Sequence, residues 1–350
     1  MWRIAKPVIP LAFALALVLV LSSVPALAQS LPDKNEVREW IKKAQEASDL
    51  GSPGAAPYHL VAKIRYAIGD KTMDGTYEIL WAAPDRYRVE FRMGDIGETD
   101  LVLGDKKYVE RNTQTMTLPM WSVSSILFFS AVLPIAQRPS SVSVHKLSWL
   151  GDGANRQICA NVGESVDQEF CFDAETRELM GIHAHPKPHS SAVNAALALD
   201  LTDYANLGKM RYPRRLVRRW GPESIDATIE KWESVQDFDE TVFAPLPNST
   251  VWDWCSTPKI EMPKSDGPYA PPINVDSMSG SLSFPYIALY KVVRADGTVK
   301  EATLLFGSPN GPAKELLERQ RHDRSAVFVC DGKPVEYEAM FVIGPLSPVH

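Results

Sequence analysis

The chain has 350 residues, of which 45% are hydrophobic and 23% are charged, and its formal net charge at pH 7 is -6. This composition indicates an ordered globular protein of about two domains and excludes an intrinsically disordered chain. The acidic balance argues against general nucleic-acid binding, because that function needs a basic surface that attracts phosphates.

Residues 1–28 have the pattern of a secretory signal peptide. Arg3 and Lys6 form a short basic region, residues 8–21 are apolar, and Ala26-Leu27-Ala28 supplies the small-x-small cleavage pattern. The apolar run is shorter than the roughly 20 residues that a membrane-spanning helix needs. We therefore expect cleavage after Ala28 and a periplasmic or secreted protein with no stable membrane span.

The mature chain is predicted to begin with a helix over residues 32–49. Val37, Trp40, Ile41 and Ala44 recur at spacings of three and four, which places them on one helical face. A turn that is rich in glycine and proline follows. The helix therefore has an apolar stripe to bury against another element.

Strand patterns follow over residues 59–111. Apolar and polar side chains alternate around Ile64 and again around Val89, which predicts an antiparallel sheet with one dry face. We place turns at Asp74-Gly75 and Gly104-Asp105. Strand patterns continue to residue 235 and give about ten strands in all, as in a large curved sheet or incomplete barrel. A second sheet, helices or a ligand has to cover the dry face.

Residues 120–133 form an apolar run, MWSVSSILFFSAVL, that is too short to cross a membrane. One interpretation is a helix buried in the core, and the other is a mobile flap over the open face of the sheet. We favour the buried helix, because apolar helices in cores are common and lids are not.

Four cysteines in an exported chain suggest two disulfides. When the apolar faces of the two strands around Cys159 and Cys171 are aligned, Ile158 lies opposite Phe172 and the two cysteines lie directly opposite each other, within disulfide range. Cys255 is then left to pair with Cys330. This second bridge would tie the linker to the last domain.

Three histidines, His183, His185 and His189, have a spacing that permits transition-metal binding. Flanking prolines and the lack of a carboxylate or thiolate nearby in the sequence favour a surface loop instead. The chain has no phosphate-binding glycine loop, no nucleophile elbow and no zinc hydrolase motif. We therefore expect no metal, no cofactor and no enzyme, and an enzyme with an unfamiliar site is the least favoured alternative.

Arginines are concentrated in residues 211–219. On a strand, one face carries Arg214 and Arg218 and the other carries Arg215 and Arg219. Guanidinium groups at the mouth of a cavity suit an anionic lipid head group, because they bind phosphate or carboxylate through paired hydrogen bonds. The alternative, which we favour, is a charged strand paired with glutamates that follow it, namely Glu223, Glu230 and Glu233.

Three segments carry a family resemblance: WAAPDRYRVE at 81–90, LVLGDKKY at 101–108 and FDETVFAP at 238–245. Over about residues 31–250 the chain resembles the LolA/LolB lipoprotein-carrier superfamily. The resemblance implies a periplasmic incomplete barrel that is wrapped round helices and holds acyl chains in an apolar cavity. One position departs from the lipoprotein-sorting carriers, since Ala83 stands where they have an arginine, whereas their later arginine is kept as Arg88. The resemblance therefore implies an apolar-ligand cavity rather than lipoprotein sorting itself.

The last part of the chain predicts a second domain. Residues 251–273 are rich in proline, as in an extended linker. Two strands joined at Asp296-Gly297, a helix over 312–324 and strands over 326–329 and 335–343 follow. This order resembles the TonB C-terminal domain over about residues 280–345. The resemblance implies a docking module that grips a peptide segment on an exposed sheet edge.

Together these patterns predict an α+β protein with a curved antiparallel sheet, or incomplete barrel, that is wrapped on helices and followed by a small α+β domain. Its parts are a signal peptide (1–28), a LolA-like sheet domain (29–250), a linker (251–273) and a TonB C-terminal-like domain (274–350). The predicted function is a non-enzymatic periplasmic protein that binds an apolar or lipidated ligand and docks on an envelope protein. The alternative is an interaction or scaffold protein with no ligand cavity. The residues expected at the cavity lining or mouth are Tyr66, Trp81, Arg88, Val89, Phe91, Trp121, Phe128, Phe129, Arg214 and Arg218.

Overall fold

The computed structural model describes residues 32–48, 55–127, 142–146, 157–162, 166–186, 197–207, 210–262 and 286–343. The predicted signal peptide with its cleavage after Ala28, the second half of the apolar run at 120–133 and the linker beyond residue 262 lie outside these ranges. Among the described helices, none is long and apolar enough to cross a membrane.

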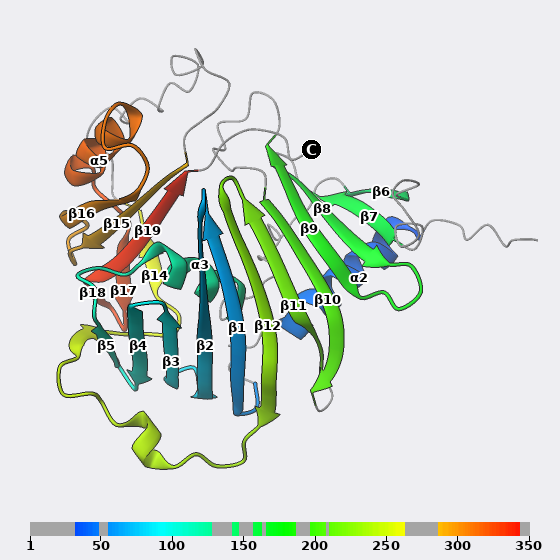
Figure 1. Cartoon of the computed structure of the whole chain (residues 1–350), viewed down its shortest axis with the longest axis horizontal. Coiled ribbons are helices and arrows are strands. Elements are labelled where there is room, and N and C mark those ends of the chain that lie inside the picture. Colours follow the sequence, from blue (N-terminus) through cyan, green and yellow to red (C-terminus); the bar gives the residue numbers. More distant parts are fainter. Residues whose placement is uncertain are drawn as a thin grey trace, which may run out of the picture.

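A single antiparallel sheet of 13 strands forms most of the described chain (Figure 1). The strand order is β13-β5-β4-β3-β2-β1-β12-β11-β10-β9-β8-β7-β6, and the sheet is open rather than closed into a barrel. The predicted large antiparallel sheet is confirmed, although the described chain is mostly β. The strands are β1 (Tyr58–Ile68), β2 (Lys71–Ala83), β3 (Arg86–Met93), β4 (Ile96–Leu103), β5 (Lys106–Arg111), β6 (Val142–Lys146), β7 (Gln157–Val162), β8 (Val166–Asp173), β9 (Leu179–Pro186), β10 (Leu197–Leu207), β11 (Met210–Trp220), β12 (Glu223–Ser234) and β13 (Thr250–Asp253).

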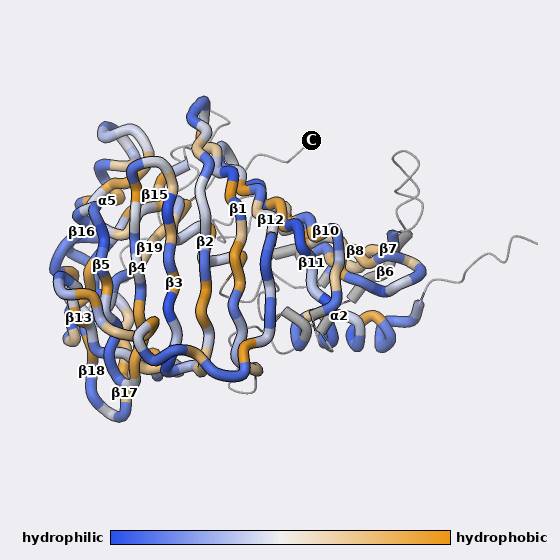
Figure 2. The backbone as a smooth tube through the Cα atoms, turned by 60° about the horizontal axis from the view of Figure 1, so that its bottom comes forward, coloured by the Kyte–Doolittle hydropathy of each residue, from blue (hydrophilic) through white to orange (hydrophobic). Residues whose placement is uncertain are grey.

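The two-residue alternation of the sequence sets which face of the sheet is dry. Tyr77 lies opposite Phe91, and Ile79 lies opposite Val89, so these side chains share one face, which we call the inner face. All four are at most 3% exposed. Figure 2 shows the same alternation as changing colour along β1, β2 and β3. The inner face therefore extends without interruption from strand to strand.

One predicted turn is wrong. Asp74 and Gly75 lie inside β2, and the chain reverses instead at Gly69 and Asp70. A β-carbon on Gly75 would collide with the carbonyl oxygen of Arg92 on β3, so this glycine allows a close approach of two strands. The turn predicted at Gly104-Asp105 is confirmed.

Two helices cover the inner face. α2 (Lys34–Ser48) begins after Asp33, whose carboxylate accepts hydrogen bonds from the backbone N–H groups of Asn35 and Glu36. Trp40 of α2 packs edge-on against Phe172, with ring centroids 5.6 Å apart. α3 (Leu118–Leu127) is almost entirely buried, so the described half of the apolar run is a core helix and not an open flap.

The C-terminal part consists of two three-stranded sheets, β14-β17-β18 and β16-β15-β19, and helix α5. The hairpin predicted at Asp296-Gly297 is confirmed, and Gly297 adopts a φ of 83° there. The segment predicted as a linker contributes β13 to the large sheet and β14 to a C-terminal sheet. The bounds are β14 (Lys259–Glu261), β15 (Ile287–Val293), β16 (Val299–Phe306), α5 (Pro312–His322), β17 (Val327–Cys330), β18 (Lys333–Val335) and β19 (Tyr337–Ile343), and a short 3-10 helix η1 (Glu240–Phe243) precedes β13.

The structure contains both disulfides. Cys159 on β7 lies directly opposite Cys171 on β8, in the register predicted from the apolar faces of the two strands. Cys255 is bonded to Cys330 and so fixes the segment between β13 and β14 to β17. The first bridge is buried and the second is half-buried.

Replacing Gly75 with alanine should lower the free energy of unfolding by about 1–3 kcal/mol, because the added methyl group overpacks the β2–β3 contact. The matched control is Gly97→Ala on β4, where the nearest atom to a new β-carbon is the side-chain nitrogen of Asn112 at 3.9 Å. Urea unfolding measures both variants. Equal stability of the two variants would contradict the close approach of β2 and β3.

Candidate functional site

The inner face changes from apolar to charged at β4. Asp100 lies opposite Val89, and Glu98 lies opposite Phe91, so both carboxylates project from the same face as the core of β3. On β5, Arg111 lies opposite Glu98, and Lys107 lies two strand positions from Val109, the partner of Asp100. Glu98 is 2% exposed and Asp100 is 7% exposed. The charged end of the inner face is therefore covered by another part of the protein.

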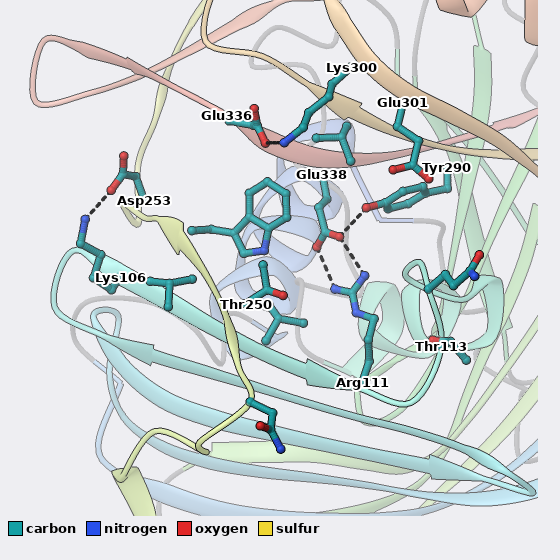
Figure 3. A pocket seen from close by; sticks show the side chains of 16 residues that line it. Lys106, Arg111, Thr113, Thr250, Asp253, Tyr290, Lys300, Glu301, Glu336 and Glu338 are labelled. Carbon is teal, nitrogen blue, oxygen red and sulfur yellow. Dashed lines mark hydrogen bonds and ion pairs between the residues drawn. The ribbon is translucent and has the colours of Figure 1, made fainter.

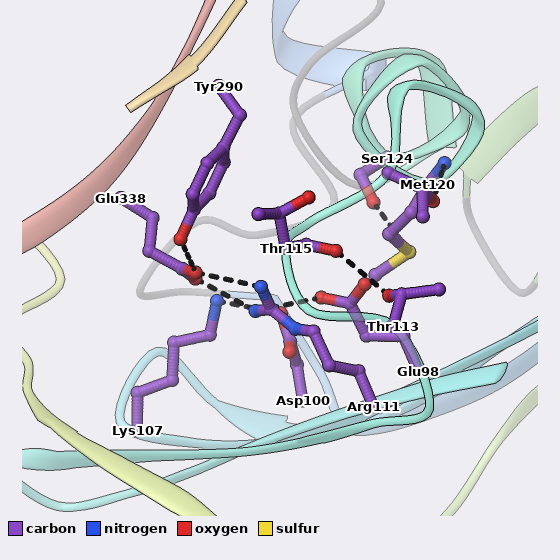
Figure 4. Close-up of polar contacts among 11 residues, drawn as sticks. Glu98, Asp100, Lys107, Arg111, Thr113, Thr115, Met120, Ser124, Tyr290 and Glu338 are labelled. Carbon is purple, nitrogen blue, oxygen red and sulfur yellow. Dashed lines mark hydrogen bonds and ion pairs between the residues drawn. The ribbon is translucent and has the colours of Figure 1, made fainter. Parts of the chain in front are cut away.

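Strands of the C-terminal part supply this cover (Figure 4). Arg111 on β5 donates two hydrogen bonds to Glu338 on β19, at 2.8 and 2.9 Å, and lies 3.2 Å from Glu98. The hydroxyl of Tyr290 on β15 donates to the same Glu338 carboxylate at 2.6 Å. Arg111 thus connects the large sheet to the C-terminal sheet through a bidentate contact, which fixes the relative orientation of the two sheets as well as their distance.

Burial and neighbouring charges decide the protonation states in this cluster. Burial, with the negative charge of Asp100, raises the pKa of Glu98 to about 8, although Arg111 opposes the shift. Burial raises the pKa of Glu338, but hydrogen bonds and charge from Arg111 lower it by more, so the net pKa shift is downward. Glu98 is therefore mostly protonated at neutral pH and Glu338 is ionised. Two cations, Lys107 and Arg111, then face two anions, Asp100 and Glu338.

A second buried polar group lies at the other side of α3. Glu223 accepts hydrogen bonds from Ser122 of α3 at 2.5 Å, from Arg218 of β11 at 2.7 Å and from the hydroxyl of Tyr286, next to β15, at 3.1 Å. Arg218 also donates to Ser125 of α3 at 2.6 Å. These bonds hold α3, the sheet and the start of the C-terminal strands together.

A cavity of about 510 Å³ lies beside the cluster of Asp100, Lys107 and Glu338. Its sheet side includes Tyr87 and Val89, and its other walls come from α3, the segment around the Cys255–Cys330 disulfide and β17–β19. Three methionines and five aromatic side chains from the chain beyond β5 line it: Met116, Met120, Met340, Trp121, Trp252, Trp254, Phe328 and Tyr337. Asp100 and Lys107 lie at its polar end.

A second pocket of about 600 Å³ shares Trp252 and Glu338 with the first in its lining. Figure 3 shows it between Arg111 and Thr250 on one side and Lys300, Glu336 and Tyr290 on the other. Its charged side chains are largely paired with one another. Lys106 pairs with Asp253, and Lys300 lies 2.7 Å from Glu336. This pocket is polar and open, so the first cavity is the better candidate for an apolar ligand.

No protein-family profile and no curated protein matches the chain. A LolA superfamily protein from Nitrosomonas europaea has 10% sequence identity, covers 58% of this chain and 97% of its own, and has a TM-score of 0.37. A putative outer membrane lipoprotein-sorting domain from Vibrio parahaemolyticus has 7% identity, covers 59% of this chain and 94% of its own, and has a TM-score of 0.36. A chain of the Pseudomonas aeruginosa MucA/MucB complex structure has 10% identity, covers 89% of this chain and 94% of its own, and has a TM-score of 0.27. The chain is thus similar to these structures in part, and the TonB resemblance stays a prediction.

The structure brings two of the predicted lining residues to the cavity, Val89 and Trp121. Tyr66, Trp81 and Phe91 are at most 2% exposed and belong to the packed core. The two predicted phenylalanines, Phe128 and Phe129, lie outside the described residues.

The predicted arginines lie away from the cavity. Arg88 points to the outer face, where it donates to the backbone oxygen of Val242. Arg214 is half exposed, 3.7 Å from Asp203, and Arg218 is buried against Glu223. Arg215 and Arg219 pair with aspartates of the flanking strands. Of the glutamates expected to pair with this strand, Glu223 pairs with Arg218, whereas Glu230 and Glu233 pair with lysines and Arg215 and Arg219 pair with aspartates.

The expectation that His183 has no carboxylate partner is wrong. Its ring nitrogens lie 3.2 Å from Glu169 and 3.7 Å from Asp200, which neighbouring strands bring to it. Hydrogen bonds with these carboxylates raise its pKa to about 9, so the ring is a cation at neutral pH and a poor metal ligand. His185 and His189 have no described side chains. The one potential ligand group found among described residues contains Cys159 and Cys171, whose sulfurs are bonded to each other.

Sequence reasoning missed the charged end of the inner face and two tryptophans, Trp252 in β13 and Trp254 just after it. A signal was present, because Glu98 and Asp100 occupy the positions of β4 that alternate with Gly97 and Thr99 and are in register with the apolar residues of β3. Their cover could not be seen in the sequence, since Glu338 lies more than two hundred residues away.

Replacing Glu98 with glutamine should make stability less dependent on pH. Folding raises the pKa of Glu98 from its ordinary 4.5 to about 8, so its contribution is fully present below the lower value and is lost as pH rises through the higher one. The fall in the free energy of unfolding between about pH 5 and about pH 9 should shrink by on the order of 3 kcal/mol. Urea unfolding over this pH range measures it.

Two comparisons make the Glu98 result specific. Glu110→Gln, on the outward side of β5, should show the same fall in the free energy of unfolding with pH as the wild-type protein. Part of the fall in the free energy of unfolding should remain in Glu98→Gln. His183 also stabilises the fold less as pH rises from 6.5 through about 9. If stability falls with pH in Glu98→Gln as steeply as in the wild-type protein, the raised pKa of Glu98 is contradicted.

Proposed function

We propose that the protein is an exported, non-enzymatic envelope protein that binds an apolar or lipidated ligand in the cavity between β3, α3 and the C-terminal strands. The observation that supports this function is the cavity itself, about 510 Å³ in volume and lined by thioether and aromatic side chains. Its volume lies within the roughly 300–1,000 Å³ of typical small-molecule sites. Methionine side chains adapt to ligands of different shape, which suits a site for flexible chains.

The ligand site occupies only one end of the inner face. Near the centre of the sheet, Val123, Ile126 and Leu127 of α3 are at most 3% exposed and belong to one continuous core with β1, β2 and β12. An acyl chain has no space there. The proposed cargo therefore lies beside the core, where the C-terminal part of the chain closes the cavity, and not inside a barrel.

The two disulfides are consistent with an oxidising compartment, and the expected signal peptide would deliver the chain to it. We propose a periplasmic location on this basis.

The docking function belongs to the C-terminal part in this proposal. β14 is an edge of the sheet β14-β17-β18, and Ile260 and Met262 at this edge are 59% and 71% exposed. Edge strands offer unpaired backbone groups to an extended segment of another protein. We propose that an envelope protein binds here by strand pairing. The TonB-like resemblance of residues 280–345 supports the same mode of binding.

Ligand binding is tested with a neutral fluorescent probe, N-phenyl-naphthylamine, and by lipid extraction of the protein purified without detergent. Ala339→Phe adds a ring to the cavity wall and should weaken probe binding about tenfold or more. Val251→Phe is the control, because this exposed residue of β13 does not line the cavity. Absence of both probe binding and co-purifying lipid would favour the alternative, a scaffold protein with a packed interior.

Docking is tested with a photo-crosslinking amino acid placed at position 260 in cells. Adducts with an envelope protein should form at Ile260 and not at Leu103, which is 39% exposed at the end of β4 in the large sheet. With the photo-crosslinking amino acid moved to position 262, a proline at position 260 should abolish the adduct if the partner pairs with the strand edge, because proline removes a backbone donor. Equal adducts at both positions would contradict docking on β14.

A further inference from the structure

Three buried polar atoms at the cavity have no hydrogen-bond partner among the residues that the structure describes. They are one carboxylate oxygen of Asp100 (Oδ1) and the indole nitrogens (Nε1) of Trp252 and Trp254. All three residues line the same cavity. Most buried polar atoms in folded proteins have a partner, so three such atoms at one cavity indicate a site that is completed by something else.

The three residues are arranged around Lys107. Trp252 lies opposite Lys107 in the pairing of β13 with β5. The Lys107 ammonium is 2.7 Å from the other Asp100 oxygen (Oδ2) and 6.0 Å from the ring centroid of Trp254. The backbone N–H of Trp254 donates to the oxygen of Asp105 at 2.8 Å, which fixes its place beyond the end of β13. The site is therefore built from three adjacent elements and not from one flexible loop.

The charges at this site are already compensated. Asp100 is paired with Lys107, and the next charges along the cluster, Arg111 and Glu338, are paired with each other. A ligand carboxylate would come against Asp100, and a ligand ammonium would come against Lys107. The buried unpaired atoms of the cavity are therefore one acceptor, on Asp100, and two N–H donors, on the indoles.

We propose that Asp100, Trp252 and Trp254 bind the uncharged head group of the ligand, an alcohol or a primary or secondary amide, while its apolar chain lies among Met116, Met120 and the other thioether and aromatic side chains. The oxygen of the alcohol or amide accepts hydrogen bonds from the two indole N–H groups. The O–H of the alcohol, or the N–H of the amide, donates to Asp100. This inference rests on the proposed function, because it assumes that the cavity takes an apolar ligand. It adds the chemical class of the polar end.

Four probes with the same chain and different head groups separate the two proposals. Decanol, decanamide, decanoate and decylamine compete with N-phenyl-naphthylamine at neutral pH. Decanol and decanamide should bind about tenfold or more tightly than the two charged probes. Equal affinities for all four would overturn the head-group inference and leave the ligand cavity standing. Failure of every probe, N-phenyl-naphthylamine included, would overturn both.

Tryptophan-to-phenylalanine substitutions test the indole donors. Trp252→Phe and Trp254→Phe keep an aromatic ring and remove the N–H, so each should weaken decanamide about fivefold and leave decylamine nearly unchanged. Neither should lower the melting temperature of the ligand-free protein much, because each removes an unpaired donor. Trp121→Phe is the matched control. Trp121 also lines the cavity, but its indole nitrogen is not among the buried unpaired atoms.

The control distinguishes hydrogen bonding from packing. Trp121→Phe should weaken all four probes by the same factor, since it changes only apolar contact. If Trp252→Phe and Trp254→Phe behave in the same way as Trp121→Phe, the indoles do not bind the head group and the inference is wrong.

Discussion

The contact between Arg111 and Glu338 is the interaction on which the rest of the candidate site depends. It joins β5 of the large sheet to β19 near the C-terminus, at the place where the inner face of the sheet turns from apolar to charged. Without the C-terminal strands, Glu98, Asp100 and Arg111 would face solvent and the cavity would have lost a wall. With them, Tyr290 and Glu338 cover the charged end of the sheet (Figure 4), and β17–β19 supply a wall of the cavity.

Buried ion pairs of this kind rarely add much stability, because removing two charges from water costs about as much as their attraction returns. Their geometric demands are strict, however. A guanidinium that holds one carboxylate by two hydrogen bonds tolerates little rotation. The pair is therefore better understood as fixing how the C-terminal sheet lies on the large sheet. The fully bonded Glu223, with Tyr286 and Ser122, has the same effect on the other side of α3.

This arrangement determines which parts of the cavity are apolar and which are polar. Its floor is the last apolar part of the inner face, its polar end is the start of the charged part, and its walls come from α3, the segment after β13 and β17–β19. A site that is apolar along one side and hydrogen-bonding at one end suits an amphipathic molecule. The tryptophans contribute to both properties, because an indole offers a large apolar surface and a single donor.

Several features of this protein were determined by local sequence alone. The alternation around Val89 gave β3 its dry face, the apolar faces around Cys159 and Cys171 gave the register of β7 and β8, and Asp296-Gly297 gave the hairpin of β15 and β16. These features depend on side chains within a few residues of one another, and period-two patterns and turn chemistry are local properties. Gly75 shows the limit of such reasoning, since a turn dipeptide in sequence is a close strand contact in space.

Only the tertiary structure decided where the open part of the inner face lies and what closes it. The sequence showed that an apolar face needed cover, but α3 could lie over any part of it, and Glu338 had no visible partner. Arg218 and Arg88 could have faced a ligand, yet one is buried against Glu223 and the other lies under η1. Long-range contacts determined these outcomes, and no local pattern encodes them. The strand order places β13 beside β5, and the Arg111–Glu338 contact joins β19 to β5.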